Sequence, residues 1–463
     1  MKLSDRLKAA EGAATRRTSV YSQATRKAPV SGDAMTEFKT KVHESLFTRL
    51  GSRLFDASLG VEQLNAYVAQ EITDLMAEAT VPLAVAERQA LASPIMDDVV
   101  GLGPVEQFLA DPTVNEVMVN SLDYIYVERA GVIETTGSRF MTADHLRRVI
   151  ERIVSQVGRR IDESSPMVDA RLPDGSRVNA IIPPLAVDGP TLTIRKFAAD
   201  PYQVEDLIEF GTLTAELAEF LDATVRVGLN VLVSGGTGTG KTTLLNVLSG
   251  FIPDDERIVT IEDAVELQLH QRHVVRLESR PPNIEGKGEV TVRDLVRNSL
   301  RMRPDRIIVG EVRGPEALDM LQAMNTGHEG SISTVHCNSP RDALSRIETM
   351  VLMSGVDLPS RAIREQISSA IDCVVHLHRF RDGSRKVTQV SEVVGMEDQT
   401  ITMSDIYSFD HSTGRDADGR VLGRIKPTGI RPAFTDRLLD AGIDLPADVY
   451  GDSALPAHWG RGR

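Results

Sequence analysis

A run of glycines that ends in a lysine and two threonines is the clearest chemical signal in the sequence. The residues Gly235-Gly236-Thr237-Gly238-Thr239-Gly240-Lys241-Thr242-Thr243 have the spacing of a phosphate-binding loop, glycine, four residues, then glycine-lysine-threonine. Such a loop surrounds a triphosphate with backbone N–H groups at a helix N-terminus, and side chains would block that approach. We expect Lys241 to reach the β- and γ-phosphates and the Thr242 hydroxyl to bind Mg²⁺.

The residues on both sides of this loop support the interpretation. The apolar run 231–233 precedes the loop and predicts a buried strand, and the run 244–248 follows it and predicts a helix. Strand before and helix after is the setting in which such a loop is found. The alternative, a glycine-rich turn with a chance lysine and threonine, does not account for these flanking elements.

Acidic residues stand at the ends of two further predicted strands. Glu262 follows the apolar run 257–261, and Glu311 follows the run 306–310. In parallel sheets that bind nucleotides, the ligand lies beyond the carboxyl ends of the strands. A carboxylate there can hold Mg²⁺ through water or polarise the attacking water of an in-line displacement. Each acid alone would indicate only a cap on a turn or helix, but two beside a phosphate loop favour a hydrolytic site.

Two histidines flank the strand predicted at 331–335. A histidine at a strand end is more often a hydrogen-bonded structural residue than a general base, and metal binding is disfavoured without a third ligand. For His328 and His336 two alternatives stay open, a structural role and the sensing of a γ-phosphate. His376 and His378 alternate on a later strand without partners nearby in sequence, and we interpret them as surface or edge residues.

Three arginines precede the phosphate loop in a separate part of the chain. Arg171, Arg177 and Arg195 lie between turn motifs, and each alone would indicate a surface salt bridge. Hydrolysis of a triphosphate often needs an arginine from elsewhere in the protein to stabilise charge in the transition state. The three are therefore candidates for that role.

The composition is that of an ordinary globular protein. A length of 463 residues suggests about three domains, and 41% hydrophobic with 25% charged residues is typical of soluble chains. No apolar run approaches the ~20 residues of a membrane span, and the first residues lack the apolar stretch of a signal peptide, so we expect the protein in the cytoplasm. The net charge of -14 argues weakly against a nucleic acid substrate. Cys337 and Cys373 form neither a disulfide framework nor a metal-ligand pattern, and we expect neither to be catalytic.

The patterns along the chain predict five segments. Residues 1–40 are basic and poor in apolar residues, which predicts a mobile arm that is solvated or touches anionic lipid. Residues 41–95 have helical spacing, and residues 96–200 mix strands with helices in an α+β domain. Residues 201–400 alternate strand and helix, the pattern of a mostly parallel three-layer α/β sheet. Residues 401–463 are predicted to form a C-terminal tail.

Several finer expectations concern turns and boundaries. Apolar residues between 146 and 157 recur at helical spacing and predict one amphipathic helix. The step at Asp200-Pro201 predicts a linker, and Ser339-Pro340 predicts the start of a helix. Asp382-Gly383 predicts a hairpin that adds an antiparallel edge to the sheet. The Gly- and Asp-rich run 410–429 indicates little structure, with one docked helix after it.

Four motifs together resemble those of one known family. The phosphate loop and the segments 260–266, 307–314 and 326–336 resemble, in order, the Walker A, Asp box, Walker B and His box of the type II/IV secretion ATPase superfamily. Two longer stretches, 280–288 and 318–325, are similar to the CpaF-type branch, which drives the assembly of tight-adherence (Flp-type) pili. The resemblance covers residues 95–400.

The resemblance implies a fold, an assembly and partners. It implies a RecA-like P-loop ATPase domain of the α/β class, preceded by the α+β N-terminal domain and a helical N-terminal extension. It further implies a homohexameric ring that uses ATP and Mg²⁺ at the inner face of the cytoplasmic membrane. The partner implied there is a polytopic inner-membrane platform protein of a pilus or secretion system, and no nucleic acid is expected.

The resemblance also implies roles for single residues. Lys241 and Thr242 would bind phosphate and Mg²⁺, Glu262 would activate water, and Glu311 would position the metal through water. His336 would approach the γ-phosphate, and Arg177 and Arg195 would reach in from the N-terminal domain. The sequence lacks the tetracysteine zinc module of the type II secretion branch. As elsewhere in the superfamily, its Walker B strand ends in Gly-Glu rather than an aspartate, so the roles of the two glutamates are interchangeable at this stage.

These observations predict a motor ATPase that converts hydrolysis into domain rotation and moves pilin or secreted subunits. One alternative is a conjugation-type or nucleic-acid-translocating ATPase of the same fold, which DNA-stimulated turnover would reveal. A second alternative is a nucleotide-gated scaffold that binds ATP and barely hydrolyses it. The presence of both strand-end carboxylates speaks against the scaffold.

Overall fold

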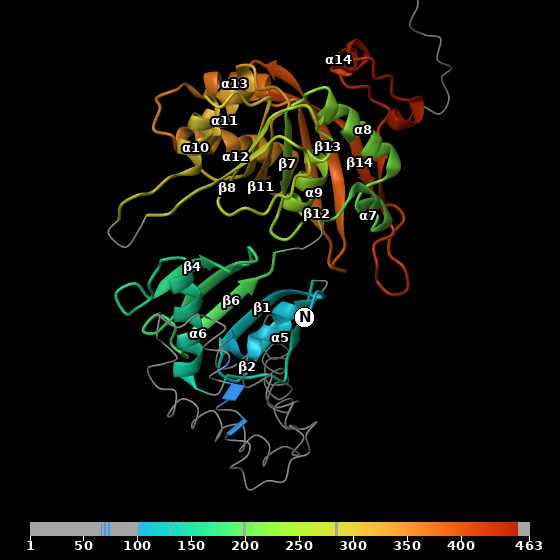
Figure 1. The fold of residues 1–463 in the computed structure, drawn as a ribbon. Helices are drawn as coiled ribbons and strands as arrows, with labels where there is room; N and C mark the ends of the chain where they lie inside the picture. The colour runs from blue at the N-terminus through green and yellow to red at the C-terminus, as the bar shows by residue number, and fades with distance from the viewer. Residues whose placement is uncertain are drawn as a thin grey trace, which may run out of the picture.

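Two sheets organise the described part of the chain (Figure 1). The computed structural model describes residues 101–451 apart from 130, 141, 198–200 and 283–285, together with five helical residues between 66 and 74. The predictions for residues 1–40, for most of 41–95 and for the linker at Asp200 lie outside these residues. In the view of Figure 1 the first sheet lies below the second.

The first sheet has six antiparallel strands in the order β3-β2-β1-β6-β5-β4. The strands are β1 (Val114–Ser121), β2 (Tyr124–Arg129), β3 (Val132–Thr135), β4 (Met167–Arg171), β5 (Arg177–Ile181) and β6 (Thr191–Arg195). The 3-10 helix η2 (Gly103–Val105) and the helices α5 (Glu106–Ala110) and α6 (Ala143–Gln156) accompany them. This mixture is the α+β domain that the sequence predicts.

Helix α6 shows why these residues fold as they do. Thr142 caps its start by accepting a hydrogen bond from the backbone N–H of His145 at 3.1 Å. The predicted apolar stripe is buried against the sheet, with Ile150 and Ile153 fully inaccessible. Val157, the last apolar residue of the predicted stripe, lies beyond the end of the helix and is 40% exposed. The buried stripe therefore ends at Val154, about one helical turn before the apolar pattern ends.

The second sheet has nine strands in the order β15-β14-β13-β12-β7-β11-β10-β8-β9. Six of them pair in parallel, from β9 to β12, and the last three pair antiparallel. The parallel strands are β7 (Val231–Gly235), β8 (Ile258–Glu262), β9 (Val274–Glu278), β10 (Arg306–Val312), β11 (Ile332–His336) and β12 (Cys373–Arg379). The antiparallel strands are β13 (Arg385–Glu397), β14 (Thr400–Asp410) and β15 (Arg424–Pro427).

Helices cover both faces of this sheet, which confirms the three-layer α/β class. One face carries α7 (Val204–Glu209), α8 (Ala215–Arg226) and α9 (Lys241–Ser249), and the other carries α10 (Val292–Ser299), α11 (Glu316–Asn325), α12 (Pro340–Leu352) and α13 (Ser360–Ala370). Strand β7 serves both cores, because Val231 and Val233 join one and Leu232 joins the other. Ser339 caps α12 and Pro340 takes its first position, as predicted.

The sheet continues past residue 400, where the sequence predicts a tail. The β12–β13 hairpin forms as expected, but β13 is not an edge, because β14 and β15 extend the sheet beyond it. Helix α14 (Thr435–Asp440) and the 3-10 helix η3 (Ala447–Tyr450) pack into the core that these strands share with α8. Tyr407 is fully buried and its ring lies 5.4 Å from that of Phe220, so aromatic packing holds the extension to α8.

Candidate functional site

The phosphate loop connects the end of β7 to the start of α9. Gly240 is the N-cap of α9 and has a φ of 94°, a left-handed conformation that favours glycine. A Cβ on Gly235 would lie 2.7 Å from the carbonyl oxygen of Leu377, too close for any side chain. The backbone at both positions therefore requires glycine, and the N–H groups of the first turn of α9 face the loop.

Lys241 is held within this loop and near an acidic side chain. Its Nζ donates a hydrogen bond to the carbonyl oxygen of Gly236 at 2.9 Å. Burial lowers the pKa of Lys241, and the nearby carboxylate of Glu311 partly opposes that effect. Glu311 lies on β10 and accepts a hydrogen bond from Nη2 of Arg313 at 2.6 Å. The structure thus brings the loop lysine and one of the two predicted acids together.

Glu262, at the end of β8, is buried and only partly satisfied. Its Oε1 accepts hydrogen bonds from the backbone N–H groups of Glu266 at 2.9 Å and Leu267 at 3.1 Å. Among the described residues its Oε2 has no partner. Burial raises the pKa of Glu262 to about 7, against the smaller opposing effects of those N–H groups and of Arg177. A carboxyl group in this environment can take up a proton near neutral pH, which suits a general base.

Gly310 allows the two acids to lie on neighbouring strands. Strands β8 and β10 pair in parallel, so their carboxyl ends meet at one edge of the sheet. A Cβ on Gly310 would lie 2.9 Å from Cγ of Glu262. The glycine before Glu311 is therefore explained by the close approach of the Glu262 side chain.

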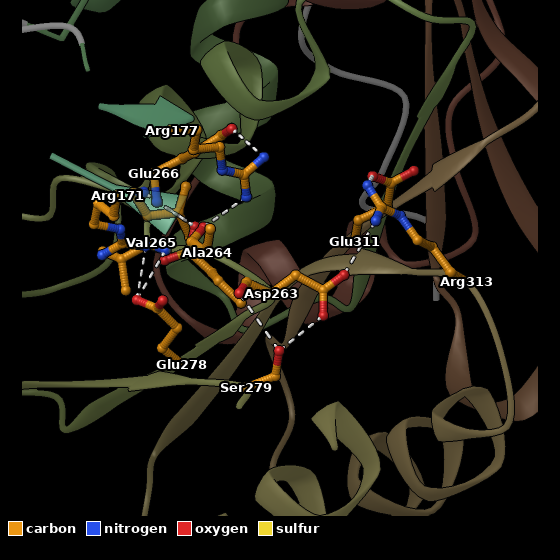
Figure 2. A network of polar contacts seen from close by, with 12 residues as sticks. Arg171, Arg177, Asp263, Ala264, Val265, Glu266, Glu278, Ser279, Glu311 and Arg313 are labelled. Carbon is orange, nitrogen blue, oxygen red and sulfur yellow. Dashed lines mark hydrogen bonds and ion pairs between the residues drawn. The ribbon is translucent and has the colours of Figure 1, made fainter. Parts of the chain in front are cut away.

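The segments that follow β8 and β10 are joined by a polar network (Figure 2). Asp263 accepts hydrogen bonds from Nη1 of Arg313 and from Oγ of Ser279, both at 3.1 Å. The buried Glu316 accepts from the backbone N–H groups of Arg313 at 2.7 Å and Gly314 at 2.8 Å. These contacts fix the backbone beyond Glu311.

Arginines of the first sheet reach this network. Arg171, Arg177 and Arg195 occupy facing positions on β4, β5 and β6. Arg177 pairs with Glu266 at 2.9 Å and donates to the carbonyl oxygen of Ala264 at 3.1 Å, as Figure 2 shows. Arg171 pairs with Glu278 at 2.8 Å. Arg177 therefore lies against the acidic segment after β8 and Arg171 against the end of β9, rather than on the phosphate loop.

A cleft of about 1130 Å³ separates the two sheets at this position. All three arginines line it together with Asp263 and Glu311, whereas the residues of the phosphate loop do not. Arg195 thus faces the same space as Glu311. Arginines of the first domain and acids of the second therefore line the same cleft.

Only one of the two histidines beside β11 lies at the site. His336 is the last residue of β11 and pairs in register with Gly235, the first glycine of the loop. His328 precedes β11 and therefore lies at the opposite edge of the sheet, with its Nδ1 buried and unpartnered among the described residues. The structure separates these two residues, and it leaves His336 as the phosphate-sensing candidate.

The interpretation of His376 as a surface or edge residue is wrong. Strand β12 lies between β7 and β13, and His376 is 5% exposed with Nδ1 2.9 Å from Oγ of Ser234. Burial lowers the pKa of His376 to about 4, so the ring is neutral near neutral pH. His378 is exposed, as predicted.

A second cavity, missed by the sequence analysis, borders the loop on its other side. It has a volume of about 200 Å³. Its lining combines loop residues with residues of α7, its flanks and the β12–β13 turn, among them Tyr202, Phe210, Thr239, Thr243 and Arg385. The rings of Tyr202 and Phe210 lie 5.4 Å apart, and both side chains are about half exposed. The two aromatic residues next to the linker predicted at Asp200-Pro201 are the sequence signal that could have pointed to this cavity.

The remaining features bear on metals and membranes. Cys337 and Cys373 are both free and buried. Within residues 101–451 as described, no three His, Cys, Asp or Glu side chains form a metal site on their own. Thr242 and Glu311 supply hard oxygen ligands, which fit Mg²⁺ because it takes few protein ligands beside substrate phosphates. No helix in the part of the chain that the structure describes is long and apolar enough to cross a membrane.

Comparisons with known proteins agree with the geometry. The family model for "Type II/IV secretion system protein" matches residues 98–422. A Mycobacterium tuberculosis protein whose name assigns it provisionally to conjugal transfer is 36% identical over 329 residues, which are 70% of this chain and 93% of that protein. The conjugal transfer protein TrbB of Rhizobium radiobacter is 34% identical over 319 residues, 68% of this chain and 92% of that protein.

A solved structure of comparable identity is also similar to this chain. The crystal structure of the VirB11 ATPase from the Brucella suis type IV secretion system, in complex with sulphate, is 32% identical and covers 62% of this chain and 92% of its own, with a TM-score of 0.35. The assignment rests on the sequence matches, since the family model spans well over half of the chain. The chain belongs to the family of type II/IV secretion ATPases.

Proposed function

We propose that this protein is a motor ATPase that hydrolyses ATP to drive pilus assembly or protein secretion, and that it belongs to the CpaF-type branch. The observation that carries the hydrolytic part is the position of Glu262 and Glu311 on neighbouring strands beside the phosphate loop. A protein that only bound nucleotide would have no need of a buried, partly satisfied carboxyl group at this point. Family membership supports the same reaction.

In this proposal each residue of the site has a role. The backbone N–H groups at the start of α9 bind the phosphates, and Lys241 neutralises the charge that builds up on the γ-phosphoryl group. Glu262 accepts the proton of the attacking water through its unpartnered Oε2. Mg²⁺, held by Thr242 and through water by Glu311, would supply charge neutralisation between the phosphates. His336 would contact the γ-phosphate.

Movement would come from the arginines of the first domain. Arg177 and Arg195 line the cleft that faces Glu311, so a closing motion would bring them toward the γ-phosphate. Arg177 would then exchange Glu266 for phosphate oxygens. Binding and hydrolysis would thereby alternate two domain positions, which a ring of six copies would use in turn. We place this ring at the inner face of the cytoplasmic membrane, against a polytopic platform protein.

The proposal is tested by comparing three variants with the wild-type protein. Lys241→Ala should lose nucleotide binding, because the loop then lacks its only lysine. Glu262→Gln and Glu311→Gln should bind ATP with Mg²⁺ and hydrolyse it at least about 10³-fold more slowly. Wild-type protein that binds ATP and hydrolyses it no faster than Glu262→Gln would favour a nucleotide-gated scaffold and reject the motor.

The names of two relatives favour a second candidate, a conjugation-type ATPase of the same fold. This candidate predicts that DNA accelerates hydrolysis and that the acceleration falls steeply with salt. Hydrolysis that is indifferent to DNA from 50 to 200 mM salt would reject it. Particle mass with and without ATP would test the hexamer independently.

A further inference from the structure

Two arginines outside every motif discussed above lie against the phosphate loop. Arg385, at the start of β13, donates a hydrogen bond from Nε to the carbonyl oxygen of Gly238 at 2.9 Å. Nη1 of Arg379, at the end of β12, lies 3.1 Å from the position that a Cβ on Gly238 would take. Gly238 has a φ of 68°, which favours glycine, so the Arg379 guanidinium occupies space that the missing side chain leaves.

The two guanidinium groups lie close together and lack acidic partners. A Cβ on Gly131 would lie 3.3 Å from Nη2 of Arg379 and 3.7 Å from Nη2 of Arg385. Among the described residues no carboxylate lies within 4.0 Å of either guanidinium, whereas Arg171, Arg177 and Arg313 all have one. Two neighbouring cations repel each other unless an anion lies between or beside them.

The surroundings identify that anion. Both guanidinium groups flank the loop whose N–H groups and lysine form a site for phosphates. Arg385 also lines the 200 Å³ cavity that begins at Thr239 and Thr243. This cavity has exposed aromatic rings suited to stacking on a planar base. The pair therefore lies between the loop and the place where the base of a nucleotide would fit.

One of the two arginines also touches the other domain. Nη2 of Arg379 donates a hydrogen bond to the carbonyl oxygen of Gly131 at 3.3 Å. Gly131 lies in the turn between β2 and β3 of the first sheet. Arg379 is thus in contact with the loop region and with the preceding domain at once.

We propose that Arg379 and Arg385 form a cationic pair that binds the nucleotide phosphates nearest the base, and that Arg379 couples this binding to the β2–β3 turn. The inference rests on the proposed function, since it takes the ligand to be a nucleotide. The contacted phosphates are present in ADP as well as ATP. The pair therefore strengthens the binding of both nucleotides, unlike Arg177 and Arg195, which would contact only the γ-phosphate.

The test measures the Kd of the full-length protein for ADP and for ATP with Mg²⁺, by calorimetry. Arg379→Gln and Arg385→Gln should each raise the Kd for ADP and the Kd for ATP by about tenfold, the usual effect of losing a charge-assisted hydrogen bond. Arg381→Gln is the matched control, because Arg381 is exposed on the same hairpin. Arg385→Lys should recover part of the loss. Melting temperatures within ~2 °C of wild type would confirm that each variant folds.

The outcomes separate this inference from the proposed function. If wild-type protein binds and hydrolyses ATP while Arg379→Gln and Arg385→Gln bind ADP like Arg381→Gln, the inference is overturned and the function stands. If wild-type protein binds no nucleotide, the proposed function fails first. Weakened ATP binding with unchanged ADP binding would also overturn the inference, since it would place the pair at the γ-phosphate.

The coupling to the preceding domain has its own readout. Saturating ADP should slow amide hydrogen exchange in residues 131–133 of the wild-type protein and of Arg385→Gln. The same addition should leave exchange unchanged in Arg379→Gln, because the contact with Gly131 is then lost. Equal slowing in all three proteins would reject the coupling.

Discussion

The two sides of the phosphate loop differ in charge and in how that charge is satisfied. On the side of β8 and β10, acids predominate, and the arginines that approach them are paired with carboxylates such as Glu266 and Glu278. On the side of the β12–β13 hairpin, Arg379 and Arg385 have no acidic partner among the described residues. The difference teaches that the first side is arranged to exchange partners, whereas the second is arranged to receive an anion.

The largest expected effect concerns the acids of the first side. Glu262→Gln should lower kcat by about 10³-fold or more, because the base that accepts the proton of water is lost. In the wild-type protein kcat/KM should fall as the pH drops below about 7, the pKa of Glu262 in the nucleotide-free protein, because the protonated acid cannot accept a proton from water. Steady-state hydrolysis from pH 5.5 to 8.5 measures both. A hydrolysis rate of the wild-type protein that does not change across pH 7 would indicate that Glu311, rather than Glu262, is the general base.

The same carboxyl group should make stability depend on pH. Its pKa is raised from 4.5 to about 7 in the folded protein, so the folded state binds the proton more tightly than the unfolded state. Stability should therefore fall by about 3 kcal/mol as the pH rises from about 4.5 to 7.5. Urea unfolding of wild type and Glu262→Gln at several pH values isolates this contribution. A constant difference between the two proteins would show that burial leaves Glu262 unperturbed.

A smaller effect should follow from crowding the acids. Gly310→Ala would place a methyl group 2.9 Å from Cγ of Glu262, which must shift. We expect a loss of about 1–3 kcal/mol in stability and a lower kcat, with an unchanged Kd for ADP. Gly137→Ala is the control, because its Cβ would have nothing within 4 Å. Equal effects of the two substitutions would contradict the close approach of the two strands.

The smallest effect should come from the paired arginines. Arg171 and Glu278 are 29% and 37% exposed, so their ion pair should contribute less than about 1 kcal/mol. A double-mutant cycle with Arg171→Ala and Glu278→Ala, followed by urea unfolding, measures the coupling energy. The exposed pair of Arg361 and Glu365 gives a reference for a pair within one helix. A coupling energy of several kcal/mol would mean that the pair locks the domains rather than exchanging partners.

Much of this arrangement was predictable from the sequence, because its parts are local. The phosphate loop, the strands before Glu262 and Glu311, and the stripe of α6 all depend on residues within one element and its flanks. The order of parallel strands then brings the acids together by a general rule. The sequence shows a glycine at position 310 but not why glycine is needed there, because the side chain that would clash with a Cβ, Glu262, comes from another strand.

The parts that escaped prediction depend on distant contacts or on misleading local patterns. Arg385 contacts Gly238 of the phosphate loop, 147 positions earlier, and Arg379 contacts Gly131 of the first sheet, 248 positions earlier. His376 alternates with apolar residues as a half-exposed strand would, yet its strand is covered on both faces. Strand β15 lies inside the Gly- and Asp-rich run 410–429, whose composition hid an element that pairing with β14 stabilises.

The pairing between β7 and β12 limits how far the β12–β13 hairpin, which carries Arg379 and Arg385, can bend. The two strands pair continuously from Cys373 to Leu377, opposite the residues that lead into the phosphate loop. Arg379 lies only two residues beyond the last pair, a reach of about 7 Å in extended chain. The backbone at Arg379 is therefore held close to the phosphate loop by the pairing of β12 with β7. A displacement of the first domain at Gly131 would move the Arg379 side chain through their hydrogen bond, while the backbone on which this side chain sits would bend little.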